Sequence, residues 1–391
     1  MQGLLILICI FSDLFSTILA FALGIELGSL LRILSIFVFV FSIYLALLTR
    51  NDFASYKTSN TFWVSLLVIL SILLSMYITY TSHDFHHPLH SGMILSFGSK
   101  VFAAAFIAFS WNKRNFIKDI LHWIVPFVCF FTFFLYLAVI KIRNTSYSGL
   151  ILNYQSLSYA AAYSIGLLFF FIRNYNQKRN WLKPLLLLLV CTNVFILFSG
   201  GGKGAFVLFC VLFLLFFYNI LKRKITLLLG VGFLFVFFEK QVIVNFIERF
   251  AGGNRILALF LSNDVETITS GRNFLYTKAI NILQDRYFLG GGPGSVLYDV
   301  GFFSHNIFLD ILVDWGFVFF FLTLFIIFIV LKKYFRNRHN ASISFLFLIF
   351  LEQFIMLFFS GSLYYSFGLW FSIIAILMYE NNDRVYYQTE C

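Results

Sequence analysis

The stretch Ser270–Phe320 reads SGRNFLYTKAINILQDRYFLGGGPGSVLYDVGFFSHNIFLDILVDWGFVFF. It begins with polar and cationic residues, passes through a glycine-rich segment and ends in an apolar run that opens with Ser304-His305-Asn306. A long apolar run is typical of a helix that crosses a membrane. Cations, acids, a histidine and flexible glycines meet here at the start of such a helix, so we expect any chemistry of the chain to occur in this stretch.

The composition of the whole chain indicates a membrane protein. Of 391 residues, 61% are hydrophobic and only 12% are charged, and the mean hydropathy is +0.90, whereas soluble domains carry about 25% charged residues. We predict an all-α, polytopic integral membrane protein with about 12 transmembrane helices, each of about 20 apolar residues. The predicted spans are residues 3–22, 27–48, 61–80, 94–111, 120–140, 154–172, 182–198, 205–221, 225–238, 305–331, 341–359 and 364–379.

The placement of Lys and Arg predicts the topology, because these residues concentrate on the cytoplasmic side of membrane proteins. They lie in the links that follow even-numbered spans, which places both termini inside, and the first 20 residues lack the basic region of a cleavable signal peptide. A long segment on the opposite side also carries cations. We therefore divide the chain into helices over residues 1–238, an extracytoplasmic loop with short amphipathic helices over residues 239–304, and helices with a cytoplasmic tail over residues 305–391.

Charged residues inside the predicted spans fall in their outer halves. They are Arg32, Lys100, Asp310, Asp314 and Glu352. Isolated charges in a membrane are costly unless they are paired or face water. Side chains could extend to the interface instead, an alternative that suits Arg32 and Lys100 better than Asp314 or Glu352. We expect a polar cavity open to the outside, next to a loop whose cations favour an anion.

The start of the loop helix favours an anion. Ser270 is a plausible N-cap for a short amphipathic helix over residues 273–283 that lies on the outer membrane surface. Arg272 falls in its first turn, where unpaired backbone N–H groups already attract negative charge. A bound phosphate would therefore stabilise both the arginine and the helix end.

The glycines and the histidine complete the predicted site. Gly290-Gly291-Gly292-Pro293-Gly294 either lets the backbone approach a ligand closely or is a plain flexible turn. We expect Ser304 to cap the next helix and to place His305 and Asn306 in its first turn. The helix dipole there disfavours imidazolium, so His305 is predicted to be neutral and able to accept a proton.

These residues resemble a known family. Gly271-Arg272, then FLGGGPG, then SHNIFLDILVDWG is similar to the signature of the O-antigen polymerase and O-antigen ligase superfamily. Upstream, FSGGGKGA over residues 198–205 resembles the Ser-x-Ser-Arg-Gly-Ala element of that family. Lys203 stands where the family usually has arginine, which keeps the charge but loses bidentate phosphate recognition.

The resemblance implies a glycosyltransferase of the bacterial cytoplasmic (inner) membrane, with its active site on the extracytoplasmic side. It implies a donor saccharide attached to undecaprenyl pyrophosphate, contact with membrane lipids, and a chain-length regulator and a flippase as partners. His305 and Arg272 are the expected catalytic residues; the residues expected to bind substrate are Lys203, Arg255, Arg286, Gly291, Gly292, Gly294, Asn306 and Asp310. No cofactor is expected.

Two alternatives to a polymerase remain open: a ligase that transfers finished glycan to lipid A core, and a transporter or flippase without chemistry. Other functions are disfavoured. Pro88 interrupts the ligand-rich stretch His83–His90, so we expect no metal site, and the net charge of +11 belongs to membrane topology rather than nucleic-acid binding. Lys203 follows glycines but lacks the remaining residues of a P-loop. Four of the five cysteines lie in apolar runs and are expected to act as small hydrophobes.

Overall fold

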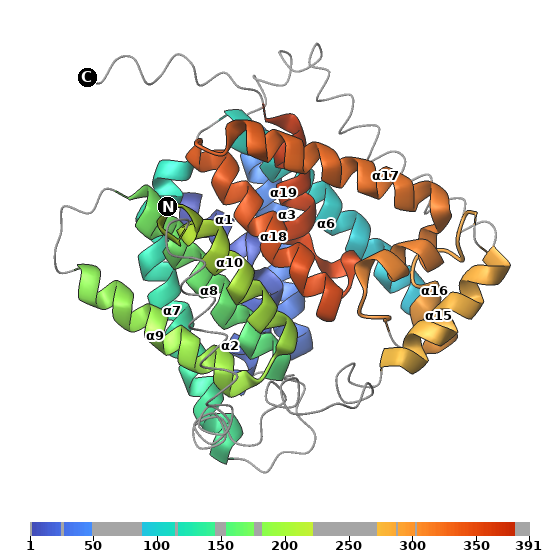
Figure 1. The fold of residues 1–391 in the computed structure, drawn as a ribbon, viewed down its shortest axis with the longest axis horizontal. Helices are drawn as coiled ribbons and strands as arrows, with labels where there is room; N and C mark the ends of the chain where they lie inside the picture. Colours follow the sequence, from blue (N-terminus) through green and yellow to red (C-terminus); the bar gives the residue numbers. More distant parts are fainter. Residues whose placement is uncertain are drawn as a thin grey trace.

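The computed structural model describes residues 2–24, 27–48, 88–113, 116–144, 154–175, 182–221, 272–286, 288–301 and 303–379. Every regular element in these ranges is a helix, so the all-α prediction is confirmed for this part of the chain (Figure 1). The predicted spans at 61–80 and 225–238, and the loop from 239 to 271, lie outside the described residues.

The helices match the predicted apolar spans closely wherever the structure describes them. The first group is α1 (Gln2–Ile10), α2 (Ser12–Leu23), α3 (Leu27–Leu48), α6 (Pro88–Lys113), α7 (Ile117–Asn144), α8 (Tyr154–Asn174), α9 (Leu182–Gly200) and α10 (Lys203–Leu221). The second is α15 (Arg272–Arg286), α16 (Ser295–Val300), α17 (Ile307–Asn337), α18 (Ala341–Phe359), the 3-10 turn η2 (Leu363–Tyr365) and α19 (Phe367–Met378).

Five of these helices are long and apolar enough to cross a membrane: α7, α8, α9, α17 and α18. The predicted first span is instead bent by 82° between α1 and α2, and the two count as one further span if the bent pair crosses as a unit. The outer face of α17 carries Phe321, Phe325, Phe328 and Phe335, each about 60% exposed. A stripe of phenylalanines at helical spacing suits lipid rather than water.

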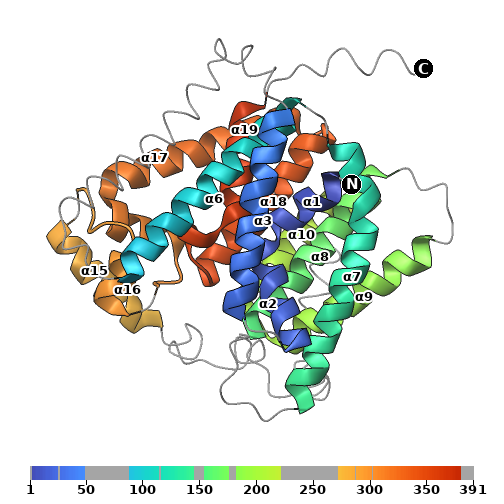
Figure 2. The same cartoon turned by 180° about the vertical axis from the view of Figure 1, so that it is seen from behind.

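Helix α8 lies near the centre of the bundle, between α7, α9 and α10, with α18 also against it (Figure 1). Its sequence is rich in Ala, Ser and Gly, and small residues let membrane helices approach closely. Gly166 shows this directly, because a methyl group there would overlap the carboxyl of Glu352 on α18. From behind, α3 and α6 cover the bundle on the side of α19 (Figure 2).

The basic ends of several helices gather at one end of the bundle. Arg173, at the end of α8, lies near Tyr334 of α17, and Lys333 donates to the carbonyl oxygens of Leu377 and Tyr379 at the end of α19. Both cations belong to links that the sequence pattern assigns to one side of the membrane. The opposite end therefore holds the end of α18 and the starts of α8, α10 and α17.

Two glycine backbones meet where α17 breaks. Gly316 has φ 72° and ψ −176°, which is not helical, and its Cα lies against Phe288 and Gly290. A Cβ on Gly290 would in turn lie 2.5 Å from the Asp314 carbonyl. The break leaves carbonyl groups of α17 without partners in the helix. Gly291 N–H donates a hydrogen bond to Val313 O, and Gly292 N–H donates one to Asp314 O, both at 2.8 Å.

The loop helix α15 packs on protein. Its apolar residues include the fully buried Ala279, which contacts Val296 of α16 and Val313 of α17. The predicted helix is confirmed, but this face covers the broken part of α17 rather than lying free for the membrane surface. Phe274 and Ile280 remain exposed on its other side.

The predicted polar cavity is not formed by the charges that suggested it. Lys100 forms an ion pair with Asp13 of α2 at 2.8 Å, and the carboxyls of Asp310, Asp314 and Glu352 are buried. Both aspartates accept hydrogen bonds from backbone N–H groups. Neither oxygen of Glu352 has a partner among the described residues. The side chain of Arg32 lies outside them.

We predict that Gly316→Ala strongly destabilises the protein, because alanine at this φ is strained and its methyl group would overlap Phe288. The expected loss is about 2–5 kcal/mol. Thermal unfolding in detergent measures it. The matched control is Gly98→Ala in α6, where a methyl group meets nothing within 4 Å. An unchanged melting temperature for Gly316→Ala would contradict the packing described here.

Candidate functional site

Arg272 fastens the start of α15 to the end of α18. Its guanidinium donates a hydrogen bond of 2.7 Å to the Phe359 carbonyl oxygen and lies 6.0 Å from the centre of the Phe359 ring. The last carbonyl groups of a helix lack intrahelical partners, so a cation is favourable there. This contact uses one N–H of the guanidinium Nη2, and the remaining N–H groups can donate to a ligand.

The turn that carries Lys203 packs against the same point. It joins α9 to α10 and is held by Ser158, whose Oγ accepts a 3.1 Å hydrogen bond from Gly202 N–H and donates to Leu197 O. Gly204 lies so close to Tyr159 Oη that a methyl group would overlap it, and the same methyl group would lie 2.5 Å from Phe359 Cβ. The start of α10 is thereby placed beside the residue that Arg272 binds.

His305 stands just before α17 with φ 56°, which makes it the single non-glycine residue of positive φ in the described ranges. Such a conformation costs about 1–3 kcal/mol and persists only where its surroundings fix it. Asp310 supplies that support, because its Oδ1 accepts a 3.0 Å hydrogen bond from Ser304 N–H. Ser304 Oγ in turn accepts from Asn306 N–H at 3.1 Å.

This geometry corrects the predicted start of α17. Asn306, not Ser304, is the N-cap, because its Oδ1 accepts from the N–H groups of Phe308 and Leu309. His305 lies outside the helix rather than in its first turn. Ser and Asn are equally good N-caps by residue type. Ser304 is held by its contact with Asp310, and Asn306 takes the capping position.

The environment of His305 favours its neutral form. Burial lowers the pKa of this imidazole below its ordinary value of 6.5, and the charge of Arg272 lowers it further. The predicted neutral state therefore agrees with the structure, although burial and Arg272 are the causes in place of a helix dipole. A neutral imidazole near pH 7 can accept a proton.

Three buried polar atoms at this end have no hydrogen-bond partner among the described residues: Tyr159 Oη, Ser199 Oγ and His305 Nδ1. Buried polar groups are normally satisfied, so each exception requires an explanation such as a bound ligand or water. These atoms come from α8, from the last turn of α9 and from the segment before α17. We refer to Tyr159, Ser199, Lys203, Arg272 and His305 as the Arg272 cluster.

The predicted glycine residues are engaged by protein. Gly291 and Gly292 bond the carbonyls of the broken α17, and Gly294 N–H donates to Asp314 Oδ2 at 3.0 Å and to Tyr364 Oη at 3.2 Å. Tyr364 also donates to Asp314 at 2.5 Å. The segment is therefore a fixed support for α16 and α17, and the structure does not bring its N–H groups to the Arg272 cluster.

The remaining predicted residues are placed as follows. Arg286 ends α15, about 21 Å along the helix from Arg272 at 1.5 Å per residue, and its side chain lies outside the described residues, as do Arg255 and residues 83–87. Asn306 is occupied as a cap and Asp310 as a support of Ser304. In the part of the chain that the structure describes, no three His, Cys, Asp or Glu residues are grouped to hold a metal.

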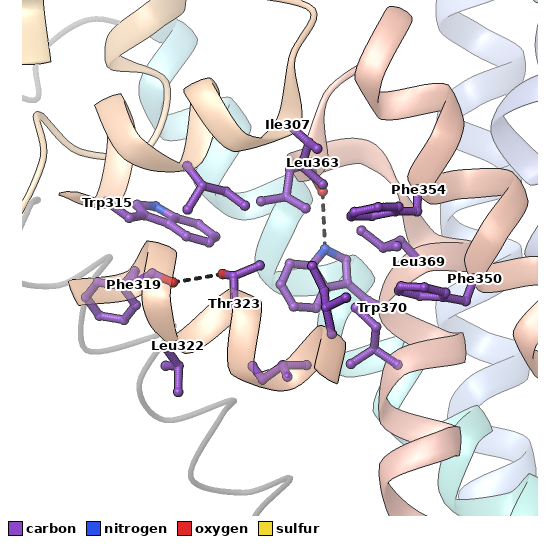
Figure 3. Close-up of a pocket in the computed structure, with 14 residues that line it drawn as sticks. Ile307, Trp315, Phe319, Leu322, Thr323, Phe350, Phe354, Leu363, Leu369 and Trp370 are labelled. Atoms are coloured by element: carbon purple, nitrogen blue, oxygen red, sulfur yellow. Dashed lines mark hydrogen bonds between the residues drawn. The ribbon is translucent and has the colours of Figure 1, made fainter. Parts of the chain in front are cut away.

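An apolar groove follows α17 from Ile307 onward (Figure 3). Its walls come from α17, α18, η2 and α19, and include Ile307, Phe319, Ile327, Phe354 and Trp370. Two of its polar atoms are bonded internally, Thr323 Oγ1 to Phe319 O at 2.8 Å and Trp370 Nε1 to Leu363 O at 3.2 Å. The groove can therefore accommodate a hydrocarbon chain but offers little to a sugar.

Sequence reasoning missed three groups of this site: the Tyr159 hydroxyl, the Ser199 hydroxyl and the Phe359 carbonyl. Tyr159 stands in a run of small residues that indicates close helix packing, and nothing in the sequence distinguishes it from Tyr163 one turn later. The backbone of Phe359 carries no sequence signal at all. The positions of Tyr159 and Phe359 depend on contacts between segments that lie far apart in the chain.

Comparison of the chain with protein-family models, with curated proteins and with solved structures gives no match.

We predict that the pKa of His305 lies below 6.5 and rises when Arg272 is replaced by Gln, because the nearby positive charge is removed. Arg272→Lys is the control, since it retains the charge and should keep the low pKa. NMR of histidine-labelled protein in detergent measures the titration, with His305→Asn identifying the signal. A pKa that does not move in Arg272→Gln would contradict the proximity of the two groups.

Stability should depend on the same titration. Because the folded protein binds a proton at His305 less tightly than the unfolded chain does, protonation favours unfolding. The free energy of unfolding should therefore fall as the pH drops through about 6.5, and His305→Asn should lose part of this dependence. Melting temperatures of both proteins between neutral and mildly acidic pH test it; identical pH profiles would contradict a buried, neutral His305.

Proposed function

We propose that this protein is a polysaccharide polymerase, a glycosyltransferase that moves an oligosaccharide from undecaprenyl pyrophosphate onto another lipid-linked repeat unit. The observation that carries the proposal is that His305 of the Arg272 cluster stands two residues before Ile307, where the lining of an apolar groove starts. A donor of this kind has an anionic head and a long hydrocarbon tail. It needs cations and polar donors next to an apolar channel, and this end of the bundle offers both.

The head of the donor would bind the Arg272 cluster. Arg272 has guanidinium donors beyond the one that bonds Phe359, and Tyr159, Ser199 and His305 contribute polar atoms without partners in the described part of the chain. Lys203 stands at the start of α10, where the helix N-terminus adds to the attraction for an anion. Together these groups favour a diphosphate over a neutral ligand.

The tail of the donor would occupy the groove along α17. The groove starts at Ile307, two residues after His305, and its lining continues to Ile327 (Figure 3). An isoprenoid chain can fill such a channel because its wall is almost wholly apolar. The phenylalanine stripe on the outer face of α17 would meanwhile contact lipid.

The chemistry follows from the neutral state of His305. The hydroxyl of the acceptor sugar attacks the anomeric carbon of the donor, a new glycosidic C–O bond forms, and the bond from that carbon to the diphosphate oxygen breaks. His305 accepts the hydroxyl proton, and Arg272 and Lys203 stabilise the charge that develops on the departing diphosphate. Asp310 acts through Ser304 and positions His305.

The wider architecture belongs to the same proposal. It comprises about 12 spans, a large extracytoplasmic loop over residues 239–304, both termini in the cytoplasm, and the bacterial inner membrane as the location. The gathering of basic helix ends opposite the Arg272 cluster supports this orientation. A chain-length regulator and a flippase are the expected partners, and Arg255 and Arg286 are further candidates for contact with the glycan.

Purified protein supplied with undecaprenyl pyrophosphate-linked repeat units tests the reaction. A polymerase lengthens the glycan and releases undecaprenyl pyrophosphate. Transfer only when lipid A core is added would identify a ligase, and binding without turnover by folded protein would favour a transporter. Either result would contradict the polymerase assignment.

Substitutions in the Arg272 cluster should abolish chain growth. We expect Arg272→Ala and His305→Asn to reduce activity about 100-fold or more, because each removes a group that acts on the transition state. Arg272→Lys should also be impaired, since lysine lacks the planar fork. Chain-length patterns and membrane protein levels are the measurements.

The matched control is Lys278→Ala. Lys278 lies on the same helix and is exposed, with its Nζ 4.5 Å from the centre of the Phe274 ring. The substitution therefore removes a cation of α15 without changing the Arg272 cluster. Its activity should stay normal. Equal losses in Lys278→Ala and Arg272→Ala would show that general charge, and not this site, matters.

A further inference from the structure

We propose that the hydroxyl of Tyr159 is a direct ligand of the diphosphate group, donating a hydrogen bond to one of its oxygens inside the Arg272 cluster. The inference rests on the proposed function, because it assumes that a diphosphate binds there. It assigns a recognition role to a residue of α8 that neither composition nor any motif of the chain indicates.

The first observation is a contrast between two tyrosines on one helix. Tyr159 and Tyr163 are both 1% exposed and lie one turn apart. The Tyr163 hydroxyl donates to Glu352 O at 3.1 Å and contacts Met356 Sδ at 3.2 Å. The Tyr159 hydroxyl has no partner among the described residues. Tyr163 therefore holds α8 to α18, whereas Tyr159 presents an unused donor.

The second observation is where that donor lies. Tyr159 Oη touches the backbone of Gly204, next to Lys203, and Gly204 also touches Phe359, whose carbonyl binds Arg272. The charge of Arg272 acts on the Tyr159 hydroxyl as well as on His305. The hydroxyl thus lies beside the residue that follows Lys203 and within reach of the Arg272 charge.

Gly204 is part of this arrangement. Any side chain at position 204 would occupy the space in front of the Tyr159 hydroxyl and press on Phe359. A glycine there lets α10 begin close to α8, with the buried Tyr159 hydroxyl directed at the turn. The Tyr159 hydroxyl therefore lacks a partner because of how the turn before α10 packs on it. Among possible partners, an anionic oxygen forms the strongest hydrogen bond with a hydroxyl donor.

Tyr159→Phe tests the role because it removes only the hydroxyl. Loss of an unpartnered hydroxyl should leave the melting temperature in detergent unchanged or raise it. The affinity for inorganic pyrophosphate, measured by isothermal titration calorimetry, should fall about tenfold or more. Farnesyl pyrophosphate serves as a second probe, because the same loss with both probes places the contact on the diphosphate rather than the tail.

Tyr163→Phe is the matched control. It should lower the melting temperature, because its hydroxyl is bonded, and should bind pyrophosphate with wild-type affinity. Wild-type affinity in Tyr159→Phe, with weakened binding in Arg272→Ala, would overturn the inference and leave the proposed function intact. If Tyr159→Phe lowered the melting temperature as much as Tyr163→Phe does, the Tyr159 hydroxyl would have a structural role, and the inference would also be overturned. Absence of binding in the wild type would overturn both.

Discussion

The contact between Arg272 and the carbonyl of Phe359 decides the arrangement of the polar end of this protein. It joins the first residue of α15 to the last residue of α18, and these two residues are 87 positions apart in the sequence. Because the guanidinium is fixed there, its charge reaches both His305 and Tyr159. The guanidinium of Arg272, fixed on the Phe359 carbonyl, thus connects α15, α8 and the start of α17 in a single site.

That contact can form because α17 is broken and supported. The break at Gly316 leaves carbonyls that pair with the glycine segment, and the buried carboxylate of Asp314 gathers two backbone N–H groups and the hydroxyl of Tyr364. The packing of Ala279 then sets α15 on this platform. The glycine segment, which resembles a ligand-binding loop, therefore has a structural role. It supports α15 and α17, and the Arg272 cluster is formed by other residues.

Much of the fold follows from the sequence, because helix formation by long apolar runs is a local property. The runs ending near Arg173 and beginning near Ile307 became α8 and α17 with boundaries close to those predicted. The site was predicted only in part. Arg272 and His305 could be identified from their local context. The partners of Asp314 and Lys100, and the Gly204 backbone beside Tyr159, lie far away in sequence, so these contacts depend on helix packing that no local pattern encodes. The prediction that Ser304 caps α17 was wrong for a local reason: Ser304 N–H donates to Asp310, and Asn306 Oδ1 accepts from the first N–H groups of the helix.

The central claim is that the Arg272 cluster binds the diphosphate of a lipid-linked donor. A structure of the protein determined with a bound polyprenyl diphosphate tests it most directly. The account predicts phosphate oxygens within hydrogen-bonding distance of the Arg272 guanidinium and the Tyr159 hydroxyl, with the isoprenoid chain in the groove beside Trp315 and Phe319. A diphosphate bound away from Arg272, or a chain lying outside that groove, would contradict it.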